Sequence, residues 1–233
     1  MKLLSGLKGL FFIMLFSGVK YSYSQQAIIW NSLQLPVQLS KKWQVPVDFS
    51  YRTIGFSASA YQYTFRTGIR RIFNPVWQAA AGGALFFTRT SFLKEDHHFV
   101  EDRRLWQEVL AEHPLGKGFS LQNRFRSEER FFEATPSARS FAALRLRYRL
   151  ALIKRINNKW RLLLADEYMQ QQDHDKFHFQ QNRLTGSASY FINSSTYVQA
   201  GYIWTKLQSS VQHVVLLAFQ KTIFLHGSGE RRK

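Results

Sequence analysis

Arginine recurs at every second position in parts of the chain, and this spacing governs what chemistry the side chains can do. Arg145, Arg147 and Arg149 alternate with leucines and a tyrosine. Arginine stays ionised, and its planar guanidinium binds a carboxylate or a phosphate through two parallel hydrogen bonds. In an extended strand these three side chains share one face, whereas in a helix they would scatter around the axis among the apolar residues. The spacing therefore predicts a strand with one cationic face and one apolar face.

The same division into a polar and an apolar face recurs in the segments 61–72, 119–131, 177–192 and 196–205. If the strands close into a barrel, the polar faces line its lumen. Rings of basic residues select anions in a pore, whereas long paired side chains can fill a narrow barrel. The sequence leaves open whether the arginines bind or pass anions or form a structural network of ion pairs. The residues predicted to line the lumen are Arg66, Arg70, Arg104, Glu108, Arg124, Arg126, Glu128, Arg130, Arg145, Arg147, Arg149, Arg161, Glu167 and Arg183.

Other groupings of reactive side chains are weak. Adjacent acids such as Glu128 and Glu129 point to opposite faces of a strand, so they do not form an acid–base pair. His174 lies among acids in a predicted loop without a recognised metal-ligand spacing. No phosphate-binding loop or nucleophile-elbow motif is present. We therefore predict no catalytic, cofactor-binding or metal-binding residues and no cofactor, with an outer-membrane lipid-modifying enzyme as the alternative among enzymes.

Composition and the first segment indicate export. The chain has 233 residues, a net charge of +17 and no cysteine, which excludes disulfides, cysteine-ligated metal sites and a cysteine nucleophile. Residues 1–24 combine early lysines, an apolar stretch over 9–19 and small residues before Gln25, which is typical of a secretory signal peptide. An amphipathic or buried first helix is the alternative. An exported basic protein meets lipid headgroups, lipopolysaccharide phosphates and anionic solutes, so nucleic acid is not an expected partner.

The remaining chain is predicted to be all-β, with residues 25–225 forming a closed antiparallel transmembrane barrel of about 10–12 strands and a polar, arginine-rich lumen. Tilted strands of about 9–11 residues are long enough to cross a bilayer, and closure leaves no unpaired edge in hydrocarbon. We place strands at 27–40, 42–54, 60–72, 75–88, 101–113, 117–132, 138–156, 158–172, 177–192, 195–207 and 210–225. This count is odd, although bacterial single-chain barrels have even numbers. Either one segment is miscounted or the first does not span.

Two further patterns bear on this interpretation. The segments Glu101–His113 and Leu162–Gln172 are compatible with helices, which would favour a soluble α+β protein. Their neighbours alternate plainly, and this favours strands instead. Short and long connections also alternate along the chain, which is typical of short periplasmic turns and longer outer loops.

Several short stretches carry a resemblance to a known family. They are Arg104–Glu108, Asn123–Phe131, Arg145–Arg149, Glu167-Tyr168 and Gln181–Arg183. With the signal peptide and an early tryptophan-containing strand, they resemble an uncharacterised family of Bacteroidetes outer-membrane proteins, domain of unknown function family 2490. The resemblance implies a β-barrel in the bacterial outer membrane and no assigned activity. The expected partners are outer-membrane lipid with lipopolysaccharide and the barrel-assembly machinery. The excess of arginine in the lumen adds a small anionic solute as a candidate partner.

The end of the chain departs from typical barrels of this kind. Such barrels usually finish on an aromatic residue of the last strand, whereas here a basic polar tail, 226–233, follows Phe224 and Leu225. A soluble periplasmic β-protein is the remaining alternative to a membrane barrel.

Overall fold

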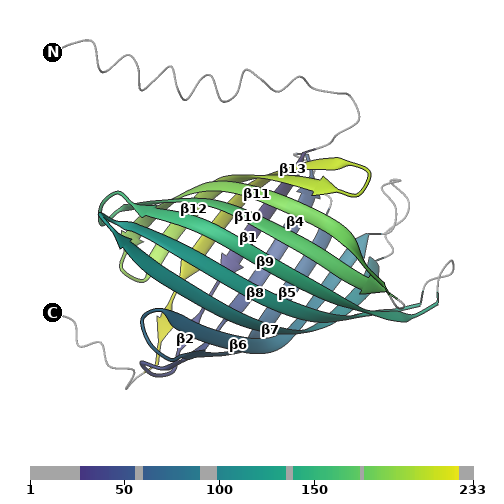
Figure 1. The fold of residues 1–233 in the computed structure, drawn as a ribbon, viewed down its shortest axis with the longest axis horizontal. Coiled ribbons are helices and arrows are strands. Elements are labelled where there is room, and N and C mark those ends of the chain that lie inside the picture. Colours follow the sequence, from purple (N-terminus) through teal and green to yellow (C-terminus); the bar gives the residue numbers. More distant parts are fainter. Residues whose placement is uncertain (1–26, 56–59, 90–98, 135–138, 174–175, 226–233) are drawn as a thin grey trace, which may run out of the picture.

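The computed structural model describes residues 27–55, 60–89, 99–134, 139–173 and 176–225. The expected signal peptide 1–24 and the basic tail 226–233 lie outside these residues. Within the described ranges every regular element is a strand, and no helix capable of crossing a membrane occurs there. The strands are tilted and wrap around a common axis (Figure 1).

The strands form one sheet that closes on itself. The short strands β2, β3 and β14 extend their neighbours β1, β4 and β13, so the closed barrel has 11 strands. The bounds are β1 Ile28–Gln34, β2 Val37–Gln38, β3 Trp43–Val45, β4 Val47–Ile54, β5 Ala60–Ile72, β6 Trp77–Arg89, β7 Phe99–Gly116, β8 Phe119–Phe132, β9 Phe141–Arg155, β10 Trp160–Asp173, β11 Lys176–Asn193, β12 Thr196–Leu207, β13 Val211–Lys221 and β14 Ile223–Phe224. The prediction of an all-β closed barrel of about 10–12 strands is confirmed.

The barrel closes through a parallel seam between its first and last long strands. β1 pairs with β13 in parallel, from Ile28 opposite Val214 to Gln34 opposite Gln220. On its other side β1 pairs with β4 antiparallel, as do the remaining neighbouring pairs of long strands. An odd number of strands that alternate in direction leaves the first and last strands pointing the same way. The odd count is therefore correct, and the expectation of a wholly antiparallel barrel fails at this one seam.

Proline breaks two strands that the sequence predicted to be continuous. The segment 27–40 is interrupted at Pro36, and the segment 42–54 is interrupted at Pro46. Proline has no N–H to donate to the ladder. Pairing resumes around the breaks, because Leu35 N–H donates to the Val47 carbonyl at 2.8 Å and Ile223 N–H donates to the Pro36 carbonyl at 2.9 Å. The barrel wall therefore stays closed at this end.

The two faces of the wall have opposite chemistry. Large apolar side chains point outwards, among them Leu164, which is 64% exposed, and Phe125. Charged side chains such as Glu128, which is 3% exposed, point inwards. Both helix-compatible segments lie in strands, Glu101–His113 in β7 and Leu162–Gln172 in β10, because each is hydrogen-bonded to a neighbour on both sides.

The long connections lie at one end of the barrel, where the short connections after β10 and β12 also lie. The connections after β2, β5, β7, β9 and β11 are short and lie at the opposite end, together with β14. The start of β1 lies at the end with the long connections, which include those after β6 and β8. β1 therefore begins at the end of the barrel with the long connections, and β13 ends at the opposite end.

Candidate functional site

The inner faces of β7, β8, β9 and β10 carry a dense set of charged side chains. Their register places arginine directly opposite arginine: Arg104 faces Arg130, Arg126 faces Arg147 and Arg124 faces Arg149. Like charges directly opposite each other on neighbouring strands are destabilising. The carboxylates offset this repulsion, because Glu108 lies opposite Arg126 and Glu128 lies opposite Arg145 in register, and both also reach arginines diagonally.

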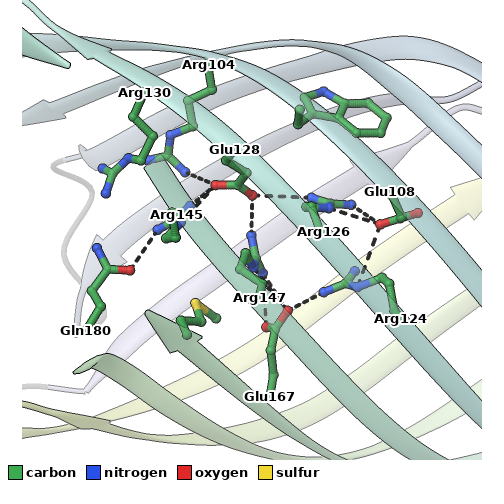
Figure 2. Close-up of polar contacts among 12 residues, drawn as sticks. Arg104, Glu108, Arg124, Arg126, Glu128, Arg130, Arg145, Arg147, Glu167 and Gln180 are labelled. Carbon is green, nitrogen blue, oxygen red and sulfur yellow. Dashed lines mark hydrogen bonds and ion pairs between the residues drawn. The ribbon is translucent and has the colours of Figure 1, made fainter. Parts of the chain in front are cut away.

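Glu128 on β8 is the centre of this arrangement (Figure 2). Its carboxylate lies within salt-bridge distance of four arginines, which come from β7, β8 and β9. The distances are 2.6 Å from Nη1 of Arg147, 2.9 Å from Nε of Arg145, 3.4 Å from Nη1 of Arg104 and 3.7 Å from Nη1 of Arg126. A buried carboxylate is tolerated only when it is paired and hydrogen-bonded, and Glu128 meets both conditions.

Three further acids extend the pairing into one connected network. Glu108 accepts a hydrogen bond of 3.0 Å from Nε of Arg126 and lies 3.7 Å from Arg124 and 3.6 Å from Arg70. Glu167 pairs with Arg147 at 2.9 Å and also with Arg124. The third acid, Asp102, pairs with Arg130 at 2.6 Å and with Arg104. We call these residues the central network: Asp102, Arg104, Glu108, Arg124, Arg126, Glu128, Arg130, Arg145, Arg147 and Glu167.

Large side chains fill the lumen beside the central network. Trp106, 3% exposed, lies with its ring centroid 5.0 Å from the Arg126 guanidinium. Its ring covers Gly68, where an added Cβ would come within 2.8 Å of a ring atom. Met169 is fully buried, and its sulfur accepts a hydrogen bond of 2.9 Å from Gln181. Buried side chains therefore fill the lumen next to the central network.

The other predicted lumen residues lie on the inner face around the central network. Arg66 lies 3.8 Å from Asp48, and Arg70 donates to Gln44 at 3.0 Å. Arg149 donates to Gln122. Arg161 stacks against Phe191 and Tyr197, with centroid distances of 5.2 and 5.0 Å. Arg183 contacts no carboxylate within salt-bridge distance among the described residues.

Sequence reasoning missed several inward residues. Asp102 lies two positions before Arg104 and shares its face, so the alternation could have revealed it. Arg52 on β4 could have been found in the same way, because it alternates with Asp48 and Ser50 and shares their face. Trp106 gave no such signal, since a tryptophan in a strand fits either face equally well.

The central network consists of arginines and carboxylates, so it acts on ions through charge. Its guanidinium groups attract anions, and its carboxylates repel them. Within the described ranges, no group of three or more histidines or acids could hold a metal ion. His174, which the sequence places in a loop, lies outside those ranges, as do His97 and His98.

Comparison with known proteins identifies the family of this chain. Neither the curated proteins nor the solved structures include a match to this chain. A family model described as protein of unknown function (DUF2490) matches residues 27–214. This range begins at the residue before β1 and ends at Val214, within β13. It therefore covers almost the whole barrel. The chain therefore belongs to the DUF2490 family, whose name assigns no function.

Proposed function

We propose that this protein is an outer-membrane β-barrel of a Bacteroidetes bacterium that binds a small anionic solute in its lumen, and that the central network keeps the bore closed at rest. The apolar outer face supports the membrane location. So do the strand lengths, because β5 to β13 contain 11 to 18 residues each. Lipid and lipopolysaccharide would surround the wall, and the barrel-assembly machinery would insert it.

The observation that carries the solute class is the excess of arginine on the inner face. Arginines there outnumber carboxylates, so the carboxylates neutralise only some of the positive charge. An anion that enters would meet guanidinium groups in a site where water screens charge weakly. The inward arginines are Arg52, Arg66, Arg70, Arg104, Arg124, Arg126, Arg130, Arg145, Arg147, Arg149, Arg161 and Arg183. The inward carboxylates with described side chains are Asp48, Asp102, Glu108, Glu112, Glu128 and Glu167.

Binding is a better proposal than free passage. The buried residues Arg126, Glu128 and Arg145 pair on the inner faces of the neighbouring strands β8 and β9, and the buried Trp106 and Met169 lie on the strands that flank them. An anion could pass only if these pairs separated. A purely structural barrel is the second candidate, and the four contacts of Glu128 favour it. In both cases we propose that the protein is not an enzyme.

Two measurements on the refolded protein test this function. A gel comparing unheated and heated samples first establishes that the barrel is folded. Titration calorimetry with inorganic phosphate is then expected to show saturable binding. Planar-bilayer recording is expected to show no steady conductance, because the network blocks the bore. A folded barrel that binds no anion would favour the structural candidate, and stable anion-selective steps would show that the lumen is open.

A further inference from the structure

A groove of about 410 Å³ lies on the outer face of the barrel over β6. Its floor is formed by Ala79 and Ala81, whose short side chains leave a depression between larger neighbours. Ile69 of β5 borders the floor on one side, and Val109 of β7 and Phe125 of β8 border it on the other. These three side chains are 42–50% exposed. The volume is within the range of about 300–1,000 Å³ that is typical of small-molecule sites.

Arg71 lines the same groove and places a positive charge beside its floor. It lies directly opposite Ala79 on one side and opposite Trp43 on the other. Its guanidinium carbon is 4.9 Å from the centroid of the Trp43 ring and 5.7 Å from that of the Phe73 ring. Among the described residues, no carboxylate lies within 4.0 Å of this guanidinium group and no hydrogen bond is made to it. The two aromatic rings therefore hold a cation whose N–H donors are available to a ligand.

Further positive charge lies at this end of the barrel, where the short connections after β5 and β7 are found and which we call the short-turn end. Lys41 and Lys42 are exposed in the turn before β3, and the Lys42 carbonyl accepts a hydrogen bond of 2.8 Å from the Ile72 N–H. Asp48 and Glu112 lie near the same end, but both point into the lumen and are hydrogen-bonded there. The outer face beside the groove therefore attracts anionic groups.

Charge distinguishes this groove from a larger one on the outer face. The larger groove, of about 980 Å³, crosses the seam between β1 and β13 and is lined by residues such as Leu33, Phe49 and Leu217. No charged side chain of the described residues lines it. It offers apolar contacts only, with nothing to fix a charged headgroup. Its exposed Ala200 is a position matched to the exposed Ala81 of the smaller groove.

We propose that the groove over β6 binds one anionic phospholipid, with an acyl chain along Ala79 and Ala81 and the phosphate against Arg71. The inference rests on the proposed function, since a lipid occupies the groove only if the barrel lies in a membrane. A guanidinium group binds a phosphate through two parallel hydrogen bonds. The exposed rings of Trp43 and Phe73 are typical of the level of the headgroups, so Arg71 lies where the phosphate of a bilayer lipid would be.

The test is native mass spectrometry of the refolded full chain titrated with phosphatidylglycerol in detergent. The wild-type chain is expected to retain one lipid, and its Kd follows from the fraction of chain that carries it. R71Q and A81L are each expected to raise this Kd about tenfold or more, because R71Q removes hydrogen bonds to a charged group and A81L fills the floor of the groove. Inorganic phosphate, which has no acyl chain, is expected not to displace the lipid.

Two matched variants control for surface charge and for apolar surface. Lys154 is another outward cation near the short-turn end, with Nζ 4.0 Å from the centroid of the Phe119 ring, and it does not line the groove. K154Q and A200L are each expected to change Kd less than about twofold. R71K, which keeps the charge but loses the planar fork, is expected to give an intermediate value. The heat-dependent gel shift checks that each variant folds.

The outcomes separate this site from the proposed function. A folded wild-type chain that retains no lipid, or unchanged affinity in R71Q and A81L, would overturn the site and leave anion binding in the lumen standing. Equal weakening by K154Q or A200L, or displacement by inorganic phosphate, would also overturn it. A dimer that A81L abolishes would show that a second copy of the chain occupies the groove instead. A chain that does not insert into phosphatidylglycerol vesicles would refute the membrane location and this site with it.

Discussion

Arg147 on β9 donates a hydrogen bond of 2.6 Å to Glu128 on β8, and its other terminal nitrogen donates to Glu167 on β10 at distances of 2.9 and 3.0 Å. One guanidinium group thus joins three neighbouring strands on the inner face of the barrel. The ladder does not place these groups opposite each other, since Arg147 faces Arg126 and Met169 in register. The long, forked side chain of arginine makes this diagonal bridge possible.

Neutralising Glu128 should destabilise the barrel strongly. Glu128→Gln would leave the surrounding arginines without their shared counter-charge, and breaking a buried ion pair from one side typically costs about 3–5 kcal/mol. Urea unfolding in lipid vesicles measures this loss of unfolding free energy. Glu129→Gln is the matched control, because Glu129 is exposed and the change should cost less than about 1 kcal/mol. Equal losses from the two variants would contradict the central role of Glu128.

The assignment of faces predicts an asymmetry between two neighbouring residues of β9. Leu150 points outwards and is partly exposed, whereas Arg149 points inwards and donates to Gln122. Leu150→Arg should impair insertion, since a cation on the lipid face at the bilayer midplane costs about 2–4 kcal/mol. Arg149→Gln should insert like the wild type. The measurement is the fraction of chain that folds into vesicles, and similar fractions for both variants would refute a lipid-facing outer surface.

The parallel seam predicts that the two ends of the barrel chain lie on opposite sides of the membrane. An epitope inserted directly before Ala27 should lie on the long-loop side, and one inserted after Leu225 should lie on the short-turn side. Antibody labelling of intact and permeabilised cells distinguishes them, with one epitope reached in both samples and the other only after permeabilisation. Labelling of both epitopes in intact cells would mean that the number of crossing strands is even.

The packing of Trp106 over glycine predicts sensitivity to a single methyl group. A Cβ at Gly68 would lie 2.2 Å from the Ala81 carbonyl oxygen and 2.8 Å from the Trp106 ring. Gly68→Ala should therefore lower the free energy of unfolding by about 1–3 kcal/mol, the usual cost of overpacking. Gly186→Ala is the control, because nothing lies within 4 Å of a Cβ there. A wild-type unfolding midpoint for Gly68→Ala would show that Trp106 does not pack tightly.

Much of the architecture follows from the amino-acid pattern. The alternation of Arg145, Arg147 and Arg149 with apolar residues predicts both the strand and its inner face, because side chains of a strand alternate strictly between faces. The odd number of strands could be counted in the same way, although the parallel seam it requires could not be foreseen from the even-number rule. The interruptions at Pro36 and Pro46 could also have been predicted from the missing N–H groups.

The partners within the lumen were decided by the tertiary structure alone. Alternation says that Glu128 and Arg147 point inwards, but the register of three neighbouring strands and the closure of the barrel decide that they meet. The same holds for Arg70 on β5 and Glu108 on β7, which lie far apart in sequence and come within 3.6 Å of each other in the folded sheet. Local sequence determines which face a side chain takes, because the period of a strand is local. Which charges become neighbours depends on pairing between distant segments, and only the folded barrel establishes it.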